Sequence, residues 1–180
     1  TWEQVEKFVD IEARRQSVAA YNARHEFHKK GLAFMPICFG ISFTNTPMNH
    51  ARALVHVYQD GSVGVSTGAV EMGQGVNTKM LQVVQQTFSI ESSKIKLETT
   101  NTTRVANTSP TAASAGADLN GKALQVACKA IKERLVQFVR KHFNLADEAL
   151  VQFKNDQIYH NNTPLNCSWE SLVSQAFLAR

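Results

Sequence analysis

Cysteine is scarce in this sequence of 180 residues. Its three cysteines, Cys38, Cys128 and Cys167, are too few and too scattered for a disulfide framework or a metal knuckle, and they lack the short spacing of an iron–sulfur site. No apolar run approaches the ~20 residues of a membrane span, and the N-terminus shows no secretion signal. We therefore expect reduced thiols in a cytoplasmic protein.

An excess of charge is also lacking. There are 19 Lys and Arg against 15 Asp and Glu, which gives a net charge of +4 and a pI of about 9.1. Aromatic residues do not interleave with the basic ones, as a single-strand binding groove requires, so we expect no nucleic-acid partner. The hydrophobic fraction of 43% is ordinary for a globular domain. The start at Thr1 rather than Met suggests an excised piece of a larger protein.

The most informative stretch is residues 62–88. Alternating Val63 and Val65 predict a strand, and helical spacing of apolar residues predicts a helix over 76–88. Between them lie three glycines, where the chain must turn sharply: Gly68, Gly73 and Gly75. A strand, a glycine turn and a helix start together aim unpaired amides and the positive end of a helix dipole at one spot, which suits an anion.

The familiar phosphate motifs are incomplete in this stretch. Gln74 and Gly75 stand where a Walker A motif needs Lys and Ser or Thr, and Thr78 replaces the third glycine of a dinucleotide fingerprint. Gln74 can both donate and accept, which suits an oxygen-bearing ligand. A structural glycine turn with a solvent-facing Gln74 is the alternative interpretation.

Residues 107–121 predict a second helix start. Ser109 can cap it, Pro110 suits the first helical position, and small side chains leave the amides of Ala112, Ala113 and Ser114 open. A tight helix-packing face is the alternative. Two such starts in one chain favour a shared anionic ligand.

The whole pattern predicts an α/β unit of mixed sheet with flanking helices, a single domain over residues 1–180 without a linker. Phe39 is expected in its core. The first expected element is an amphipathic helix over 1–30 with a Thr1–Gln4 capping box and an end at Gly31. Strands are expected over 32–43, 51–58, 62–66 and 95–98, and helices over 76–88 and 111–142. A hairpin over 151–159 and a terminal helix capped by Ser168 complete the expected order.

Four blocks of sequence carry a family resemblance. E-M-G-Q-G-V-N-T-K-M (71–80) is followed by T-N-T-T-R-V-A-N-T-S-P-T-A-A-S (100–114), and F-G-I-S-F-T (39–44) and V-H-V-Y-Q-D-G-S-V (55–63) precede them. These blocks resemble, in order and spacing, the molybdopterin-binding domain of the xanthine dehydrogenase family of molybdenum hydroxylases. The resemblance runs over roughly the whole chain and is weakest in the last thirty or so residues.

The resemblance implies an oxidoreductase activity. The family hydroxylates aromatic heterocycles or aldehydes at a molybdenum atom held by a pterin dithiolene, with oxygen from water. Electrons leave through 2Fe-2S clusters and, in many members, FAD to NAD. The implied partners are a purine substrate, the remainder of the molybdenum-binding subunit, and iron–sulfur and FAD domains or subunits within an oligomeric enzyme.

The resemblance also implies roles for particular residues. The Gly73 and Gln74 amides and the Gln74 side chain would hold the cofactor and an oxygen ligand of the metal, so that Gln74 lies in the second shell of the metal. Ala112, Ala113 and Ser114 would take the pterin or its phosphate by backbone N–H. Gly116 stands where many relatives have Ser.

The implied substrate pocket involves Phe43 and Thr44. The Phe43 ring would pack against a planar heterocycle, and the Thr44 hydroxyl would hydrogen-bond to it, which favours a purine over an aldehyde.

Several family features are absent from the sequence. It lacks the glutamate base in its Gly-Glu-Pro-Pro context, the Gly-Phe-Gly-Gly loop, and the substrate-orienting Glu and Arg of purine-oxidising members. Glu71, the only carboxylate beside the glycine turn, is interpreted as a structural backbone acceptor. No catalytic residue is therefore expected here, and the chain alone should be inactive. The alternatives are a hydroxylase of aldehydes, nicotinate or other N-heterocycles, and a non-catalytic domain that lost the metal.

Overall fold

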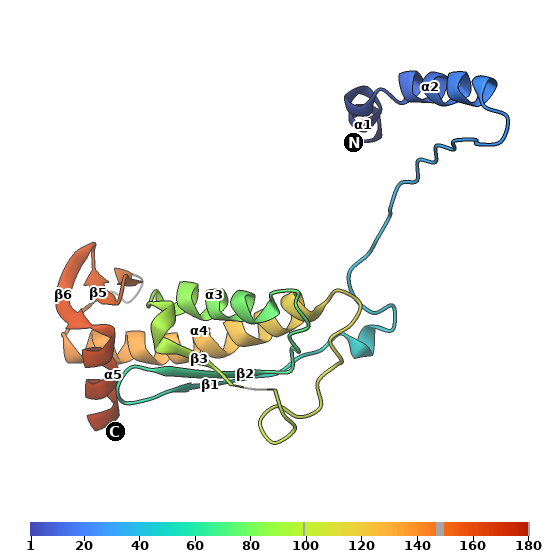
Figure 1. The fold of residues 1–180 in the computed structure, drawn as a ribbon. Helices are drawn as coiled ribbons and strands as arrows, with labels where there is room; N and C mark the ends of the chain where they lie inside the picture. The colour runs from blue at the N-terminus through green and yellow to red at the C-terminus, as the bar shows by residue number, and fades with distance from the viewer. Residues whose placement is uncertain (99, 147–149, 180) are drawn as a thin grey trace. The chain divides into compact units, whose positions relative to one another are not determined.

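The computed structural model describes residues 1–98, 100–146 and 150–179, which form two compact units, residues 1–40 and 41–180 (Figure 1). The single domain expected over residues 1–180 stays a prediction, because two compact units can belong to one domain.

The first unit holds two helices where the sequence predicts one. α1 spans Trp2–Val9 and α2 spans Ile11–Arg24. Asp10 separates them with a left-handed backbone (φ 45°), and its carboxylate accepts a hydrogen bond from the Ala13 N–H at 3.1 Å, which caps α2. Thr1 makes no side-chain cap, and α2 ends well before Gly31, so the predicted capping box and helix end are wrong.

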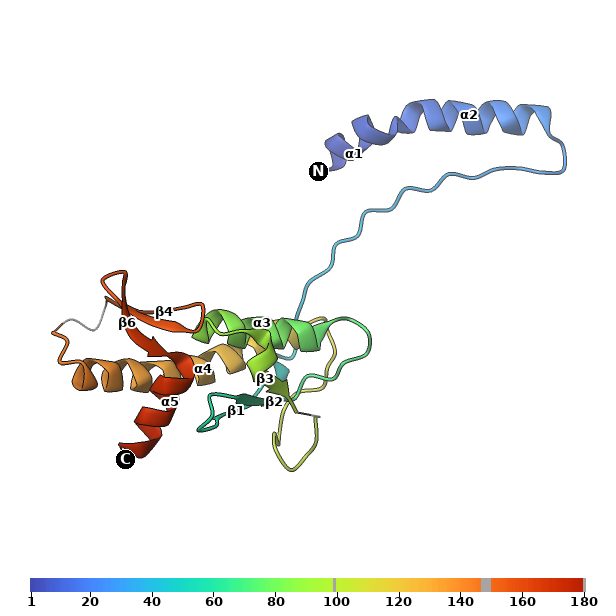
Figure 2. The same cartoon turned by 60° about the vertical axis from the view of Figure 1, so that its left-hand side comes forward.

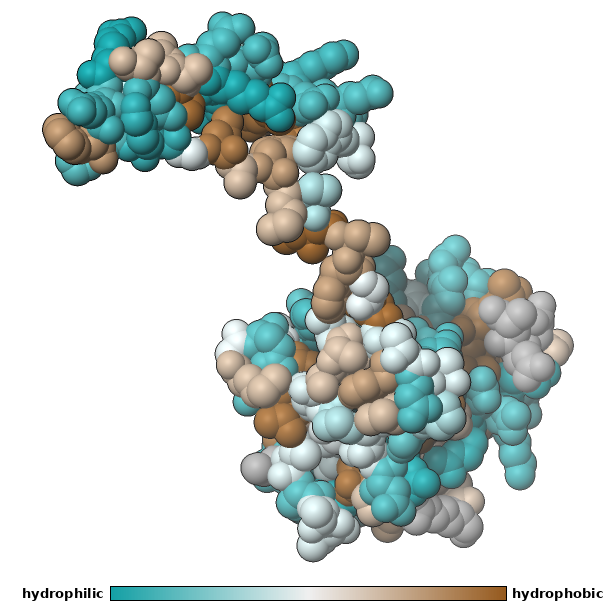
Figure 3. All heavy atoms as spheres, turned by 90° about the vertical axis from the view of Figure 1, so that its right-hand side faces the viewer, coloured by the Kyte–Doolittle hydropathy of each residue, from teal (hydrophilic) through white to brown (hydrophobic). Residues whose placement is uncertain are grey.

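Residues 32–43 do not form the predicted strand. Apolar side chains are exposed along this segment (Figure 3), and Phe39, which we expected in the core, is 68% exposed. A strand needs a neighbour for its backbone N–H and C=O groups. Residues 32–41 have no hydrogen-bonded neighbour within the part of the chain that the structure describes. The alternating pattern alone could not reveal that absence.

The second unit is built on a mixed three-stranded sheet, as predicted. β1 (Ala53–Val57) runs antiparallel to the central β2 (Val63–Thr67), which runs parallel to β3 (Ile95–Leu97). Every β2 residue is buried. Short 3-10 turns precede β1 and β3, at Thr46–Met48 and Ser92–Lys94.

Two long helices lie on the same side of this sheet (Figures 1 and 2). α3 spans Val76–Phe88, as predicted, and α4 spans Gly116–His142. The predicted start of α4 at residue 111 is wrong. Ala113 and Ser114 have left-handed backbones (φ 52° and 53°), which a right-handed helix cannot contain, so the helix begins after them.

A second sheet follows α4. β4 (Val151–Lys154) and β5 (Gln157–His160) form the predicted hairpin, and β6 (Thr163–Ser168) adds a strand that the sequence did not predict. α5 spans Trp169–Leu178, and the Ser168 hydroxyl accepts from the Ser171 N–H at 3.2 Å, as the predicted cap requires.

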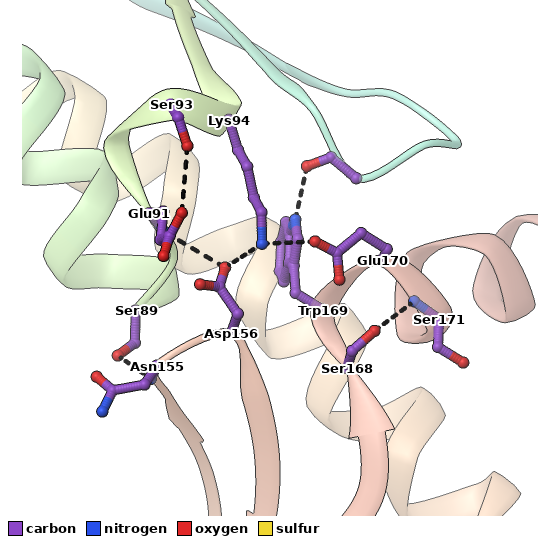
Figure 4. A network of polar contacts seen from close by, with 11 residues as sticks. Ser89, Glu91, Ser93, Lys94, Asn155, Asp156, Ser168, Trp169, Glu170 and Ser171 are labelled. Atoms are coloured by element: carbon purple, nitrogen blue, oxygen red, sulfur yellow. Dashed lines mark hydrogen bonds and ion pairs between the residues drawn. The ribbon is translucent and has the colours of Figure 1, made fainter.

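Trp169 and a charged cluster join this second sheet to the core (Figure 4). The Trp169 ring is fully buried, and its Nε1 donates to the Gly61 carbonyl at 2.6 Å. The Lys94 ammonium contacts the Asp156 carboxylate at 2.6 Å and the Glu170 carboxylate at 2.5 Å. One lysine, at the end of the 3-10 turn before β3, therefore links that turn to the β4–β5 turn and the start of α5.

The three cysteines are unpaired. Burial raises the pKa of Cys128 to about 12, so its thiol stays protonated at neutral pH. In the described residues, no helix has the length and hydrophobicity that crossing a membrane requires.

We expect Lys94→Met to lower the free energy of unfolding at pH 7 by about 1 kcal/mol, because both partly exposed ion pairs are lost. The Lys94 ammonium holds the pKa of Glu170 below its ordinary value of 4.5. The Glu170 contribution is therefore present above pH 4.5 and lost as pH falls through the lowered pKa. Urea unfolding from pH 7 to pH 3 should show the difference between wild type and variant narrowing.

Lys96→Met is the matched control, because the Lys96 side chain is 78% exposed and, among the described residues, forms its one ion pair with Glu98 at 3.3 Å. Its effect should be smaller than that of Lys94→Met at pH 7. An equal loss in both variants, or a Lys94 effect that does not change with pH, would contradict the role given to this cluster.

Candidate functional site

The two sequence stretches that predict helix starts lie together at one end of the α3–α4 pair (Figure 1). The Val70 N–H donates to the Thr111 hydroxyl oxygen at 2.9 Å across 41 residues of sequence. Gly68 allows this approach, since a Cβ atom there would lie 2.4 Å from the Thr108 hydroxyl oxygen, far inside contact distance. The glycine at the end of β2 thus serves close packing between the two segments.

A cavity of about 400 Å³ opens between the two helix starts. Both segments contribute to its wall, which is made of Met72, Gln74, Val76, Lys79, Thr111, Ala112, Ser114, Gly116 and Ala117. All of these residues are described, and their side chains include one cation and no carboxylate. Small residues on the α4 side leave the backbone close to the cavity.

Glu71 organises the glycine turn from within. Its Oε1 accepts from the N–H groups of Gly73 and Gly75, and its Oε2 accepts from the Asn77 N–H, each at 2.9 Å. The hydrogen bonds from Asn77 and Gly75 lower the pKa of the exposed Glu71 carboxyl, so it is ionised at neutral pH. The interpretation of Glu71 as a structural backbone acceptor is confirmed, and the expected set of unpaired amides is smaller because Gly73 is engaged.

The turn is left-handed at both of its glycines, with φ 97° at Gly73 and 75° at Gly75. Gly75 is the N-cap residue of α3. Residues with a side chain rarely adopt these backbone angles, which explains why glycine occupies both positions.

Gln74 lines the cavity with its side chain folded over its own turn. Its Oε1 accepts from the Met72 N–H at 2.6 Å, and its Nε2 donates to the Val70 carbonyl at 2.8 Å. The backbone N–H groups of Gln74 and Val76 have no acceptor among the described residues. These two amides belong to residues of the cavity wall and remain as donors for a ligand, which reaches the Gln74 side chain only by exchanging two hydrogen bonds.

The second segment is held in an uncommon backbone conformation. Ala113 and Ser114 are consecutive residues with positive φ, which is costly for residues other than glycine and often found at ligand sites. The Ala113 carbonyl accepts from the Ser42 N–H at 3.0 Å. Ser109 does not cap α4 as predicted, because α4 starts at Gly116 and the Ser109 hydroxyl donates to the Met48 carbonyl.

Phe43 and Thr44 lie outside the cavity wall. Phe43 is half-buried, and the Asn49 side chain bonds both its N–H and its C=O at 2.8 Å, whereas Thr44 is exposed. The adjacent Ser42 is tied to Ala113, and the His50 ring lies 3.1 Å from the Asn107 carbonyl. The predicted substrate residues are thus connected through the backbone to the predicted cofactor segment.

The structure therefore brings Gln74, Ala112 and Ser114 to one cavity and leaves Gly73 and Ala113 beside it. Their cofactor contacts remain predictions.

Sequence reasoning missed Lys79, which lines the same cavity. A Walker A motif has its lysine directly after the glycines, whereas Lys79 lies within α3. Residues three apart on a helix are neighbours, so the spacing from Val76 to Lys79 was a usable signal.

The amino-acid sequence matches the family model of the molybdopterin cofactor-binding domain over residues 4–180. Xanthine dehydrogenase/oxidase of Mus musculus is 47% identical over 141 residues, which cover 78% of this chain and 11% of that protein. Nicotinate hydroxylase hnxS of Emericella nidulans is 44% identical over 146 residues, which cover 81% of this chain and 11% of that protein. This chain therefore spans about a tenth of the length of these curated relatives.

Among solved structures, quinoline 2-oxidoreductase from Pseudomonas putida 86 has a similar fold, with a TM-score of 0.75 and 18% sequence identity. The match covers 98% of this chain and 23% of that one.

Proposed function

The chain belongs to the molybdopterin cofactor-binding domain family, and from that premise we propose that it is part of the molybdenum-binding subunit of a xanthine dehydrogenase. The observation that carries the proposal is that two helix starts with small residues meet at one cavity. The wall of this cavity includes a lysine and no carboxylate. Such a cavity suits an anionic, oxygen-rich ligand, because unpaired amides, the dipole of α4 and the Lys79 ammonium all favour negative charge.

The residues present fit a molybdopterin group. In the intact enzyme, the amides of Ala112, Ala113 and Ser114 would hold the pterin or its phosphate, and Lys79 would add a positive charge on the α3 side. The Gln74 amide would donate to the group, and its side chain would do so after exchanging its hydrogen bonds with Met72 and Val70. Gly73 supplies the turn geometry that places both. When bound, the cofactor supplies the redox and oxygen-transfer chemistry, while this chain supplies binding and orientation.

Phe43 and Thr44 orient the substrate in this proposal. The ring of Phe43 stacks on a planar heterocycle and the Thr44 hydroxyl hydrogen-bonds to it, which favours xanthine or hypoxanthine. Iron–sulfur clusters, FAD and NAD in other domains or subunits of an oligomeric, cytoplasmic enzyme would accept the electrons. Because the glutamate base is absent from this sequence, we expect the chain alone to be inactive.

A hydroxylase of another N-heterocycle is the second candidate. Its support is the similarity to a nicotinate hydroxylase, whose identity to this chain is close to that of the xanthine dehydrogenases. Both candidates use the same cofactor cavity and differ at the substrate.

We expect Gln74→Ala in the full-length parent enzyme to lower molybdenum and pterin content per polypeptide by roughly tenfold or more, as loss of an outer-shell contact commonly does. Metal analysis and pterin fluorescence would measure this. Gln82→Ala, which changes an exposed glutamine on α3, the helix that follows the Gln74 turn, is the control and should leave both contents unchanged. Unaltered cofactor content in a folded Gln74→Ala enzyme would contradict the assignment.

We expect Thr44→Val in the same enzyme to lower kcat/KM for xanthine by about tenfold, because one hydrogen bond to a polar substrate is lost. Molybdenum content should not change, since Thr44 lies outside the cavity wall. Steady-state rates with xanthine, hypoxanthine, nicotinate and a benzaldehyde would test this. An unaltered xanthine rate would favour the second candidate.

A further inference from the structure

The N-terminus of α3 already contains an anion that belongs to the chain. The Glu71 carboxylate accepts hydrogen bonds from three backbone N–H groups, those of Gly73, Gly75 and Asn77, each at 2.9 Å. These are donors that a bound phosphate would otherwise use at a helix start. Glu71 lies two residues before Gly73 in the sequence, so the acceptor for the amides of this turn comes from the turn itself.

A second anion at the same amides would meet this carboxylate. Two negative charges within about 4 Å repel each other strongly unless water or a cation separates them. Within the described residues, no Lys or Arg forms an ion pair with Glu71. The remaining groups that this turn offers are the neutral side chain of Gln74 and the amides of Gln74 and Val76, none of which bonds to Glu71.

The α4 side of the cavity has no such internal anion. Thr111, Ala112, Ser114, Gly116 and Ala117 form that wall, and Lys79 faces the cavity from α3. Asp118, in the first turn of α4, is not part of the wall. The two helix starts therefore differ in charge although both are rich in small residues.

We propose that Glu71 is a specificity-determining residue that occupies the anion position of the α3 N-terminus and excludes anionic ligand groups from the Gly73, Gly75 and Asn77 amides. The α3 turn then offers the cofactor only hydrogen bonds from Gln74 and Val76, and the anionic end of the cofactor is directed to the wall formed by α4. This inference rests on the proposed function for the identity of the ligand. The exclusion itself is a property of this chain.

The test uses the 180-residue chain, labelled with ¹⁵N, and inorganic phosphate as the probe. Amide chemical shifts of Gly73, Gly75 and Asn77 are followed during titration of wild type, Glu71→Gln and Glu71→Asp. Glu71→Gln keeps the side-chain length and removes the charge. Glu71→Asp keeps the charge but is one methylene shorter, so it cannot reach all three amides.

In wild type, phosphate should leave these three amides unshifted. Glu71→Gln should bind phosphate there at least roughly tenfold more tightly, because the repulsion is gone. Glu71→Asp should still exclude phosphate, while the Gly75 or Asn77 amide exchanges faster with solvent. Glu91→Gln, which neutralises an exposed carboxylate in front of β3, should behave as wild type.

Two outcomes would overturn the proposal. One is phosphate binding at these amides in wild type with the affinity of Glu71→Gln; the other is a folded Glu71→Gln chain that still excludes phosphate. If Glu71→Gln disrupts the turn, Glu71→Asp decides, since phosphate binding by that variant would show that charge is not the cause. Failure of the proposed function would appear separately, as a parent enzyme without molybdenum.

Discussion

The close approach of the end of β2 to residues 108–111 is the constraint on which the site depends. At Gly68 there is no room for a side chain against Thr108, and two residues later the Val70 N–H bonds to Thr111. These contacts place the glycine turn before α3 beside the small-residue segment before α4. Without that approach, two helix starts distant in sequence would remain separate features rather than walls of one cavity.

The two walls perform different tasks because their charges differ. On the α3 side, the Glu71 carboxylate accepts hydrogen bonds from three amides and holds the turn together without any ligand. On the α4 side, Ala113 and Ser114 hold an uncommon backbone conformation that exposes main chain. Lys79 brings a positive charge to the cavity from α3, on a long side chain. A ligand with an anionic end and a neutral, hydrogen-bonding end fits this asymmetry.

An element of this fold could be predicted from the sequence where a local pattern of residues specifies it. The strand, turn and helix over 63–88 were predicted because alternation, three glycines and helical spacing follow one another there. The start of α4 was missed because a left-handed backbone at Ala113 and Ser114 leaves no trace in residue type. The segment 32–43 has a strand pattern, yet pattern says nothing about the neighbour a strand needs. β6 was missed because Pro164 interrupts its alternation.

The site itself was only partly predictable. The resemblance named Gln74, Ala112 and Ser114, and the structure places these at one cavity, but Lys79 and the hydrogen bonds of Glu71 depend on three-dimensional placement.

The measurement that tests the account most directly is molybdenum and pterin per polypeptide in the intact parent subunit, purified with its natural partners. The account predicts a stoichiometric content of both. A folded, fully assembled subunit that contains neither would contradict it and would favour a domain that kept the fold and lost the metal.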